Sequence, residues 1–574
     1  MKKNMLSALA LMLGMLPAQA QQVEFLGDNQ SLVRINTNNR YLLIPVQERA
    51  EMAHVRVVKN NQLAQTFNVR LAVDKIDYFV PLDLNTVSGE AVLQVKVPAQ
   101  QHVNKAFKDY SCWTSMKYSD TFDSRNVEKF RPAYHHSPVY GWMNDPNGLF
   151  YKDGVWHLYY QWNPYGSQWE NMTWGHSTST DGLHWTPQPT AIEADALGAI
   201  FSGCCVVDKN NTAGFGNGAI VAYYTSAGAR QTQSMAYSLD GGQTFTKYAG
   251  NPVIVSDVPD FRDPHIFWNE EAGFWNMVLA SGQEMSIYSS KDLKQWKHES
   301  NFGLTYGNHS GVWECPDLMK LPVDGTGEQK WMLICNINPG GPFGGSATQY
   351  FIGQFDGHQF VCEDQPEETK WMDYGKDHYA TVTFDNAPDG RRVAIAWMSN
   401  WQYANQVPTM QFRSTNSILR DLSLYQYEGE TYCAVRPAKE MDTARGKKIA
   451  RPTDRCEIVV TLKGDARITL SNGSKERVVL DYDADMASLD FDRRHSGQCS
   501  FSDAFPTVVT APVHGSLRTL RIFIDKSSIE VFDADGRLSM TNLVFPSSPY
   551  NRISVKGKAN ANIYEIKYYA FNSI

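Results

Sequence analysis

Three carboxylate side chains could act together in catalysis, and each lies in a short motif that stands apart from the rest of the chain. Asp145 lies in GWMNDPNGL (residues 141–149), Asp263 in FRDPH (residues 261–265) and Glu314 in WECPDL (residues 313–318). Two carboxyl groups that face each other across a sugar are the minimum set for hydrolysis of a glycosidic bond. One attacks the anomeric carbon or activates water, and the other protonates the leaving oxygen. A third carboxylate can bind sugar hydroxyls.

Each motif also has a structural interpretation. Asn, Asp, Pro and Gly are the commonest turn residues, so Asp145 taken alone is better explained as a turn residue, and only the set of three motifs favours catalysis. Arg262 and Asp263 could form a structural ion pair. Cys315 follows Glu314 directly, but the chain has no Cys-His signature that would activate a thiol, so we expect it to pack.

The elements that position these acids are indicated by an internal repeat. A Ser-x-Asp-Gly-x-x-aromatic pattern occurs as STDGLHW (179–185) and, with one insertion, as SLDGGQTF (238–245). Weaker copies are SKDLKQW (290–296) and QFDGHQF (354–360). An apolar segment recurs five times in the same rhythm, as WHLYYQW, IVAYYTS, FWNMVLAS, KWMLICN and RVAIAWMS. A period of roughly 40 to 60 residues with several strands per copy predicts a five-bladed β-propeller, with the Asp-Gly steps as hairpin turns.

The spacing of the three acids fits this repeat. Asp145 and Asp263 are 118 residues apart, and Asp263 and Glu314 are 51 residues apart, which is close to two repeats and one repeat. If each acid lies on or beside the innermost strand of a different blade, the three side chains converge on the central funnel. We therefore expect a single site at the propeller axis.

Short strands flank the repeat region on both sides, and helical periodicity is scarce, so the chain is predicted to be all-β. Residues 21–130 are expected to form a small N-terminal β domain that ends near Val97, followed by a linker. Residues 131–430 are the expected propeller, which holds 14 of the 15 tryptophans. Residues 431–574 contain a second run of short alternating segments, from CEIVVTLKG to NIYEIKYYAF, which predicts a C-terminal β-sandwich.

Residues 1–20 have the features of a secretory signal peptide. They contain two lysines, an apolar run from Met5 to Leu16 and the small-residue cleavage site Ala18-Gln19-Ala20. Export to the periplasm or the extracellular medium is therefore expected, and no later apolar run is long enough to span a bilayer. Removal of the two lysines changes the formal charge from -8 to -10, which argues against nucleic acid or an anionic membrane as a partner and fits a neutral substrate.

The cysteines and histidines do not indicate a metal site. The nine cysteines form no CxxC pairs, so we expect most of them to be buried apolar side chains, with room for one disulfide of unassigned pairing. His135 and His136 are adjacent, but no other residues with metal-ligand spacing accompany them. We expect neither a metal nor a cofactor.

Taken together, WMNDPNG, FRDP and ECPDL resemble, in this order and near these spacings, the three motifs of glycoside hydrolase family 32, the invertase, inulinase and levanase family. The likeness extends to His135 and Pro138, and to LRIFIDKSSIEVF and TNLVFP in the C-terminal region, so it covers about residues 131–574. Two features depart from the family pattern. Cys204 follows FSG where Ser is usual, and residues 21 to about 130 lie outside the two-domain plan.

The resemblance implies a retaining mechanism. Asp145 would be the nucleophile, Glu314 would act first as the acid and then as the base, and Asp263 would stay ionised beside Arg262 and stabilise the transition state. The resemblance also implies a set of substrate-binding residues, namely Trp142, Asn144, Gln161, Trp169, Phe201, Ser202 and Arg262.

The implied activity is release of terminal β-D-fructofuranosyl units from levan, inulin or fructo-oligosaccharides, with sucrose as a further candidate substrate. An endo-acting fructanase and a fructosyltransferase are close alternatives, and the latter differs only in whether water or a sugar takes the intermediate. A non-catalytic fructan-binding protein is the alternative from another class, and the three intact acids argue against it. The sequence leaves open the β-2,1 or β-2,6 linkage, the oligomeric state and the role of the N-terminal domain.

Overall fold

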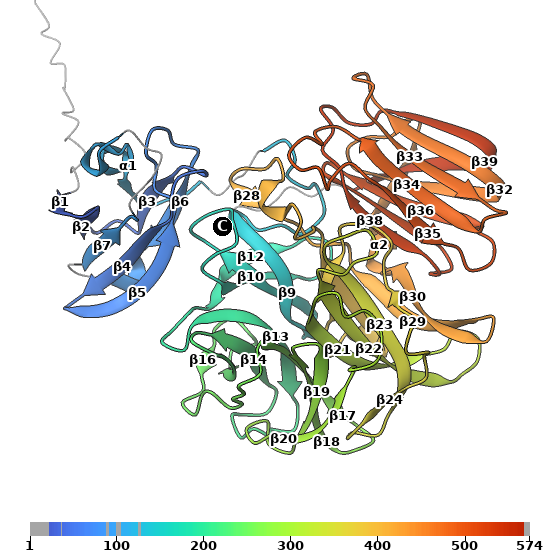
Figure 1. The fold of residues 1–574 in the computed structure, drawn as a ribbon, viewed down its shortest axis with the longest axis horizontal. Helices are drawn as coiled ribbons and strands as arrows, with labels where there is room; N and C mark the ends of the chain where they lie inside the picture. Colours follow the sequence, from blue (N-terminus) through green and yellow to red (C-terminus); the bar gives the residue numbers. More distant parts are fainter. Residues whose placement is uncertain (1–21, 36, 88–90, 99–104, 124–127, 568–574) are drawn as a thin grey trace, which may run out of the picture. The chain divides into compact units, whose positions relative to one another are not determined.

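The computed structural model describes residues 22–35, 37–87, 91–98, 105–123 and 128–567, and the expected signal peptide lies outside these ranges. The chain forms two compact units, Met1–Phe122 and Asp123–Ile574. Figure 1 labels many of the elements of both units. Within the described ranges, no helix has the length and apolar character needed to cross a membrane.

The first unit is built on two antiparallel sheets, in the orders β1-β2-β7-β4-β5 and β6-β3-β8. Its strands are β1 (Gln22–Gly27), β2 (Gln30–Ile35), β3 (Tyr41–Val46), β4 (Ala53–Lys59), β5 (Gln62–Val69), β6 (Tyr78–Asp83), β7 (Ala91–Lys96) and β8 (Lys117–Ser119). Its short helices are η1 (Leu84–Val87), η2 (Phe107–Asp109) and α1 (Cys112–Ser115). Part of the expected linker belongs to this unit, because β8 pairs with β3 and the indole N–H of Trp113 donates to the Phe107 carbonyl at 2.7 Å.

Five antiparallel sheets of the second unit form the predicted five-bladed propeller (Figure 1). Blade 1 comprises β9 (Gly141–Lys152), β10 (Val155–Asn163), β11 (Thr173–Ser179) and β12 (Thr186–Ile192). Blade 2 comprises β13 (Ala199–Asp208), β14 (Ala219–Ala227), β15 (Gln231–Ser238) and β16 (Thr246–Lys247). Blade 3 comprises β17 (Phe261–Asn269), β18 (Phe274–Ser281), β19 (Glu284–Ser290) and β20 (Lys297–Phe302).

Blades 4 and 5 complete the ring. Blade 4 comprises β21 (Val312–Pro322), β22 (Gln329–Asn338), β23 (Ala347–Phe355) and β24 (Phe360–Cys362), with β25 (Lys370–Trp371) also paired to β23. Blade 5 comprises β26 (Tyr379–Thr383), β27 (Arg392–Trp397), β29 (Arg420–Tyr427) and β30 (Glu430–Pro437), with η3 (Pro388–Gly390) and η4 (Ala404–Gln406) in its connections. The propeller therefore extends beyond residue 430.

The repeated sequence patterns occupy equivalent places in the blades. The five apolar segments are the second strands β10, β14, β18, β22 and β27, and the Asp-Gly copies lie in the turns between the third and fourth strands of blades 1 to 4. In the first copy, Asp181 Oδ1 accepts hydrogen bonds from the backbone N–H groups of Leu183 and His184 at 2.9 and 2.8 Å. This turn role confirms that the repeated aspartates are structural.

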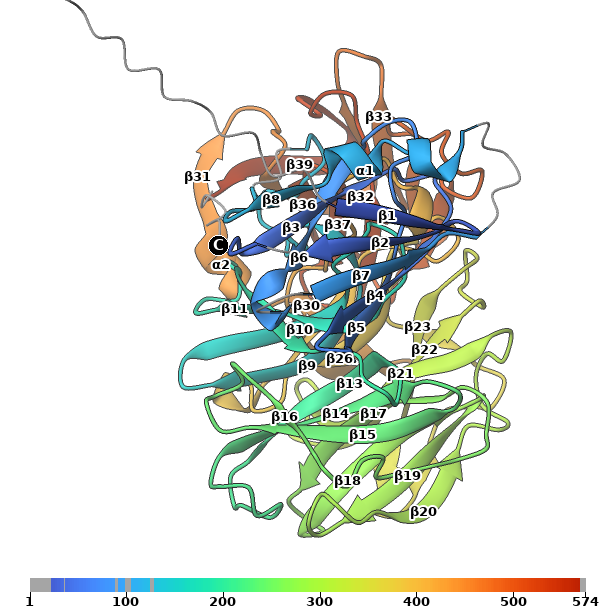
Figure 2. The same ribbon diagram turned by 90° about the vertical axis from the view of Figure 1, so that its left-hand side faces the viewer.

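The first strand of each blade lies innermost. Neighbouring first strands contact one another in a closed ring, β9, β13, β17, β21 and β26, and then β9 again. The ring closes because β28 (Phe412–Arg413), which follows β27 of blade 5, pairs in parallel with β9 of blade 1. Apolar cores fill the space between blades, as where Trp156 packs edge to face on Phe384 with ring centroids 5.0 Å apart. Figure 2 shows blades 2 and 3 side by side.

The C-terminal region forms the predicted sandwich, and two of its strands are longer than expected. Its elements are α2 (Glu440–Ala444), β31 (Arg445–Ile449), β32 (Cys456–Ser471), β33 (Arg477–Asp483), β34 (Ser488–His495), β35 (Val508–Pro512), β36 (Thr519–Asp525), β37 (Ser528–Asp533), β38 (Ser539–Leu543) and β39 (Arg552–Ile566). CEIVVTLKG and ARITLSNG join as β32, because a register shift between Leu462 and Ala466 lets one strand continue. The first half of β32 pairs with β36 and the second half with β33, so the strand serves both layers of one apolar core.

Buried polar groups join the propeller to the sandwich. His135 contacts Asp525 at 2.8 Å and Glu530 at 2.7 Å, and both acids lie on sandwich strands. Arg420 of blade 5 also binds Glu530, at 2.5 Å. All nine cysteines lie within the described ranges and all are free, so no disulfide forms among them.

Candidate active site

Each of the five innermost strands carries a β-bulge at the candidate site. The pairing register with the second strand shifts at Met143–Pro146 in β9, Ile200–Gly203 in β13, Arg262–His265 in β17, Glu314–Asp317 in β21 and Tyr379–Val382 in β26. A bulge takes a residue out of the ladder and re-aims its side chain. Asp145, Ser202 and Asp263 lie inside such bulges, and Glu314 directly precedes one. The three predicted acids therefore come from blades 1, 3 and 4.

Prolines accompany the three acidic bulges. Pro146 and Pro264 directly follow Asp145 and Asp263, and Pro316 lies two residues after Glu314. Proline has no N–H for a ladder hydrogen bond, so within sheets it occurs at edges and bulges. Non-glycine residues in the left-handed region mark the same positions, with φ of 67° at Asp263, 42° at Cys315 and 54° at Ala380. Such conformations persist only where the surrounding structure enforces them.

Asp145 is held by a short chain of hydrogen bonds. Its Oδ2 accepts from the Ser202 hydroxyl at 2.6 Å and its Oδ1 from the Asn144 amide at 3.0 Å. Asn144 is in turn fixed by the indole N–H of Trp142 at 2.8 Å. Trp142 is fully buried, so its ring supports Asn144 and is not exposed to the funnel. Asp145 itself is partly exposed.

Glu314 has a different partner on each carboxylate oxygen. Arg262 donates to Oε1 from Nε at 3.3 Å and from Nη2 at 3.0 Å. The Tyr379 hydroxyl donates to Oε2. The Glu314 side chain is 20% exposed, so its carboxyl group is accessible from the funnel while its position is fixed.

Asp263 lies deepest of the three acids. Its Oδ2 accepts from the backbone N–H of Cys315 at 2.9 Å, and its own N–H donates to Thr225 Oγ1 at 3.0 Å. The Cys315 thiol lies 3.4 Å from Asp145 Oδ2 and 3.6 Å from Asp263 Oδ2, and Cys315 directly follows Glu314 in the chain, so this residue lies where the three acids come together.

Arg262 lies beside Asp263 and favours its ionised form, but burial outweighs this effect. Its nearest nitrogen is 4.0 Å from the Asp263 carboxylate, whereas it makes hydrogen bonds to Glu314 and Asp260. Burial raises the pKa of Asp263 to about 7. Arg262 acts in the opposite direction, and the neighbouring charges of Glu314 and Asp145 raise the pKa further.

The pKa of Glu314 is also raised above its usual value. Burial is the main cause, Arg262 and the Tyr379 hydrogen bond act against it, and the charge of Asp145 adds to it. A carboxyl group with a raised pKa keeps its proton nearer neutral pH, which a general acid requires.

The other predicted substrate-binding residues lie around the acids at different depths. Gln161 is 2% exposed, and its Nε2 has no hydrogen-bond partner within the described part of the chain. Trp169 is 40% exposed and meets Phe201 edge to face with ring centroids 6.1 Å apart. Gln161 therefore offers a buried donor, and Trp169 offers an open aromatic face.

Two residues of the site were not assigned to it from the sequence. Tyr379 lies in no motif, and nothing in its local sequence indicates that β26 brings it to Glu314. Cys315 was expected only to pack, and it does lie in an apolar cluster with Trp142 and Tyr379, but its thiol also contacts two acids. The sequence did contain a signal for the three acidic bulges, namely Pro146, Pro264 and Pro316.

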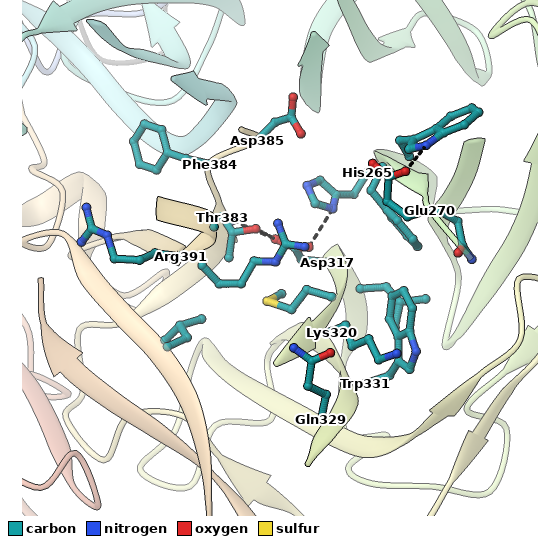
Figure 3. A pocket seen from close by; sticks show the side chains of 18 of the residues that line it. His265, Glu270, Asp317, Lys320, Gln329, Trp331, Thr383, Phe384, Asp385 and Arg391 are labelled. Atoms are coloured by element: carbon teal, nitrogen blue, oxygen red, sulfur yellow. Dashed lines mark hydrogen bonds and ion pairs between the residues drawn. The ribbon is translucent and has the colours of Figure 1, made fainter. Parts of the chain in front are cut away.

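A cavity of about 660 Å³ lies further along the strands that carry Asp263 and Glu314. Figure 3 shows His265 pointing toward Asp317, at 2.8 Å, with Thr383 on the same carboxylate. His265 ends the FRDPH motif, and Asp317 lies in the WECPDL motif. Both motifs therefore extend from the candidate site to a set of contacts that joins blades 3, 4 and 5. His135 also has a structural environment, because its ring nitrogens face Asp525 and Glu530.

Comparison with known families assigns most of the chain. The family model described as "Glycosyl hydrolases family 32 N-terminal domain" matches residues 135–435. The model described as "Glycosyl hydrolases family 32 C terminal" matches residues 428–570. Residues 27–134 match a domain of unknown function, DUF4980.

Individual relatives and solved structures agree with these matches. A levanase of Bacillus subtilis is 44% identical over 453 residues, which are 73% of this chain and 67% of the relative. An extracellular exo-inulinase of Aspergillus niger is 37% identical over 486 residues, 73% of this chain and 90% of the relative. The crystal structure of exo-inulinase from Aspergillus awamori has a TM-score of 0.72 at 34% identity, and the match covers 77% of this chain and 99% of that one.

Proposed function

The chain belongs to glycoside hydrolase family 32, and on that premise we propose that it releases terminal β-D-fructofuranosyl units from fructans with retention of configuration. The levanase, exo-inulinase and invertase names of its relatives support a β-fructofuranosidase. The observation that carries the proposal is the meeting of Asp145, Asp263 and Glu314, from three blades, around Cys315.

In the first half-reaction, Asp145 is the nucleophile. One of its carboxylate oxygens attacks the anomeric carbon of the terminal fructosyl unit, and the bond from that carbon to the glycosidic oxygen breaks. Glu314 gives its proton to the departing oxygen, so the leaving sugar departs as a neutral alcohol. The hydrogen bonds from Ser202 and Asn144 hold the Asp145 carboxylate in place for this attack.

In the second half-reaction, Glu314 is the base. It takes a proton from water as the water oxygen attacks the same carbon, and the ester bond to Asp145 breaks. Fructose is released with its original configuration, because two inversions have occurred. Glu314 is then protonated again and Asp145 is ionised, so both residues are ready for another cycle.

The remaining residues recognise the fructosyl unit. Asp263 binds sugar hydroxyls and stabilises the oxocarbenium-like transition state without attacking, and its raised pKa means that it gives or accepts hydrogen bonds depending on pH. Arg262 holds Glu314. Gln161 supplies a buried amide donor, and Trp169 and Phe201 supply apolar contacts at the rim.

We also infer that the protein is exported, which its extracellular relatives support. We assign residues 1–20 as the cleaved leader, so the fructan would be hydrolysed in the periplasm or the medium. A neutral polysaccharide fits the net negative charge of the chain, because no electrostatic attraction to the substrate is needed.

The experiment is incubation of the purified protein with levan, inulin and sucrose in separate reactions, followed by chromatography of the products. Free fructose as the first and main product supports exo-hydrolysis. A ladder of shorter oligomers would indicate endo action, and products longer than the donor would indicate fructosyl transfer. Binding of the polymers without any product would indicate a fructan-binding protein and contradict the proposal.

A further inference from the structure

The two oxygens of the Glu314 carboxylate are chemically different in this site. Oε1 faces two N–H groups of Arg262, at 3.3 and 3.0 Å, and a guanidinium can only donate hydrogen bonds. Oε2 faces the hydroxyl of Tyr379, and a phenol can donate or accept. A proton on Oε1 would point at other donors, so protonated Glu314 carries its proton on Oε2.

Tyr379 is placed for this contact by the fold. It lies on β26, the innermost strand of blade 5, and it is 1% exposed. The next residue, Ala380, has a φ of 54° and lies in the bulge that turns the strand. Burial, with the charge of Glu314 next, holds the pKa of Tyr379 well above its usual value, so the phenol stays neutral and keeps its proton available.

We propose that Tyr379 is the positioning residue of the acid/base, and that its hydroxyl exchanges the donor and acceptor roles with Glu314 Oε2 in the two half-reactions. When Glu314 is ionised, Tyr379 donates to Oε2. When Glu314 is protonated, the hydroxyl rotates and accepts from Oε2 until a glycosidic oxygen takes its place. This inference rests on the proposed role of Glu314, and it gives blade 5 a part in the reaction.

Other charged and titratable groups also face Glu314, and the test must separate them from Tyr379. They are Arg262, Asp145, Asp263, Cys315 and Cys335. Of the two groups that donate hydrogen bonds to the Glu314 carboxylate in the described structure, only Tyr379 can also accept one. Replacement of its hydroxyl leaves the other five groups in place.

The test is Tyr379→Phe, which removes one hydroxyl and keeps the ring. The hydroxyl stabilises the ionised form of Glu314, so its loss should raise the Glu314 pKa, by about one unit. The pKa is read by NMR titration of protein labelled with ¹³C at glutamate carboxyl groups, with the Glu314 signal assigned by its absence in Glu314→Gln. The basic limb of kcat/KM on levan oligosaccharides should move to higher pH by the same amount, and kcat should fall about tenfold with KM little changed.

Tyr403→Phe is the matched control. The Tyr403 hydroxyl donates to the buried carboxylate of Asp377 at 2.5 Å, so this variant removes the same type of hydrogen bond away from the acids. It should leave the Glu314 titration and the pH profile unchanged. An unchanged Glu314 pKa in Tyr379→Phe, or an equal shift in Tyr403→Phe, would overturn the inference. Wild-type protein that releases no fructose would contradict the proposed function, whereas the NMR titration would still decide the contact between Tyr379 and Glu314.

Discussion

In the funnel, Asp145 and Asp263 contact Cys315, and the guanidinium of Arg262 binds the third acid, Glu314. At the interface between propeller and sandwich, Asp373 and Glu530 bind Arg420 at 2.9 and 2.5 Å, and Asp377 binds Arg493 at 2.5 Å. His135 adds further contacts to Glu530 and Asp525. Both regions contain buried acids. Each of these interface acids has a cation within 2.9 Å, whereas in the funnel Arg262 lies 3.0 Å from Glu314 and only 4.0 Å from Asp263.

The pKa values follow this difference. Burial acts to raise the pKa of Glu530, but Arg420 and His135 outweigh it and the pKa is lowered. In the funnel, burial prevails, so the pKa values of Asp263 and Glu314 are raised. Acids with lowered pKa values hold the propeller and the sandwich together, whereas acids with raised pKa values are destabilising when ionised and remain available for proton transfer. We expect that replacement of an acid in the funnel will reduce activity. Replacement of a cation that pairs with the interface acids should instead reduce stability.

The largest expected effect is on catalysis. Asp145→Asn and Glu314→Gln should each lower kcat/KM on levan by about ten-thousand-fold, because each removes a group that the transition state requires. The melting temperature should not fall in either variant. Activity assays and circular dichroism on the same preparations check both statements, and near-wild-type turnover in one variant would remove that residue from its role.

Replacement of a cation at the interface should lower the stability of the protein and leave its catalytic rate unchanged. Arg420→Ala leaves Asp373 and Glu530 buried without their guanidinium, which should lower the free energy of unfolding by roughly 3–5 kcal/mol. Urea unfolding measures the loss, and kcat of the folded protein should stay within about twofold of wild type. A stable but inactive variant would show that the two regions are not separate.

Asp263→Asn should stabilise the protein while it removes activity. The folded pKa is raised from 3.8 to about 7, so ionisation of Asp263 destabilises the native state progressively as pH rises from 4 to 7, and the full penalty is present above that. The variant should therefore be more stable than wild type at pH 8 by roughly 2–4 kcal/mol and nearly equal at pH 4. Urea unfolding at both pH values checks this, and a loss of stability at pH 8 would contradict it.

The stability that His135 contributes should also fall as pH rises, but over a higher pH range. Its folded pKa is raised from 6.5 to about 9 because Asp525 and Glu530 outweigh burial, so the stability it contributes is complete below pH 6.5 and is lost as pH rises through 9. His135→Gln should cost roughly 2–3 kcal/mol at pH 6 and clearly less at pH 9.5. An equal cost at both pH values would show that the contribution of His135 is packing and not charge.

The repeating parts of the fold could be predicted from the sequence. The apolar segments and Asp-Gly turns recur with the blade period, because every blade buries the same strands and turns at the same places. The structure confirms the five blades and the sandwich. The three acids also meet as their spacing predicted, since equivalent positions of different blades face one axis.

Contacts between residues far apart in the chain could not be predicted in this way. Tyr379 reaches Glu314 across 65 residues, and His135 reaches Glu530 across 395, without any local pattern that announces the partner. The direction of the Arg262 side chain depends on the bulge in β17, so adjacency to Asp263 in sequence did not give its hydrogen bonds. The fused strands β32 and β39 follow from register, which alternation alone does not fix.

The most direct test of the three-acid centre is to trap the intermediate. Glu314→Gln is mixed with p-nitrophenyl β-D-fructofuranoside, whose leaving group needs no acid, and the quenched protein is digested and analysed by mass spectrometry. We predict one fructosyl unit esterified to Asp145 within residues 141–149, because the base that would release it is missing. A fructosyl unit on any other residue, or nitrophenol release with no covalent adduct and inverted fructose, would contradict the account.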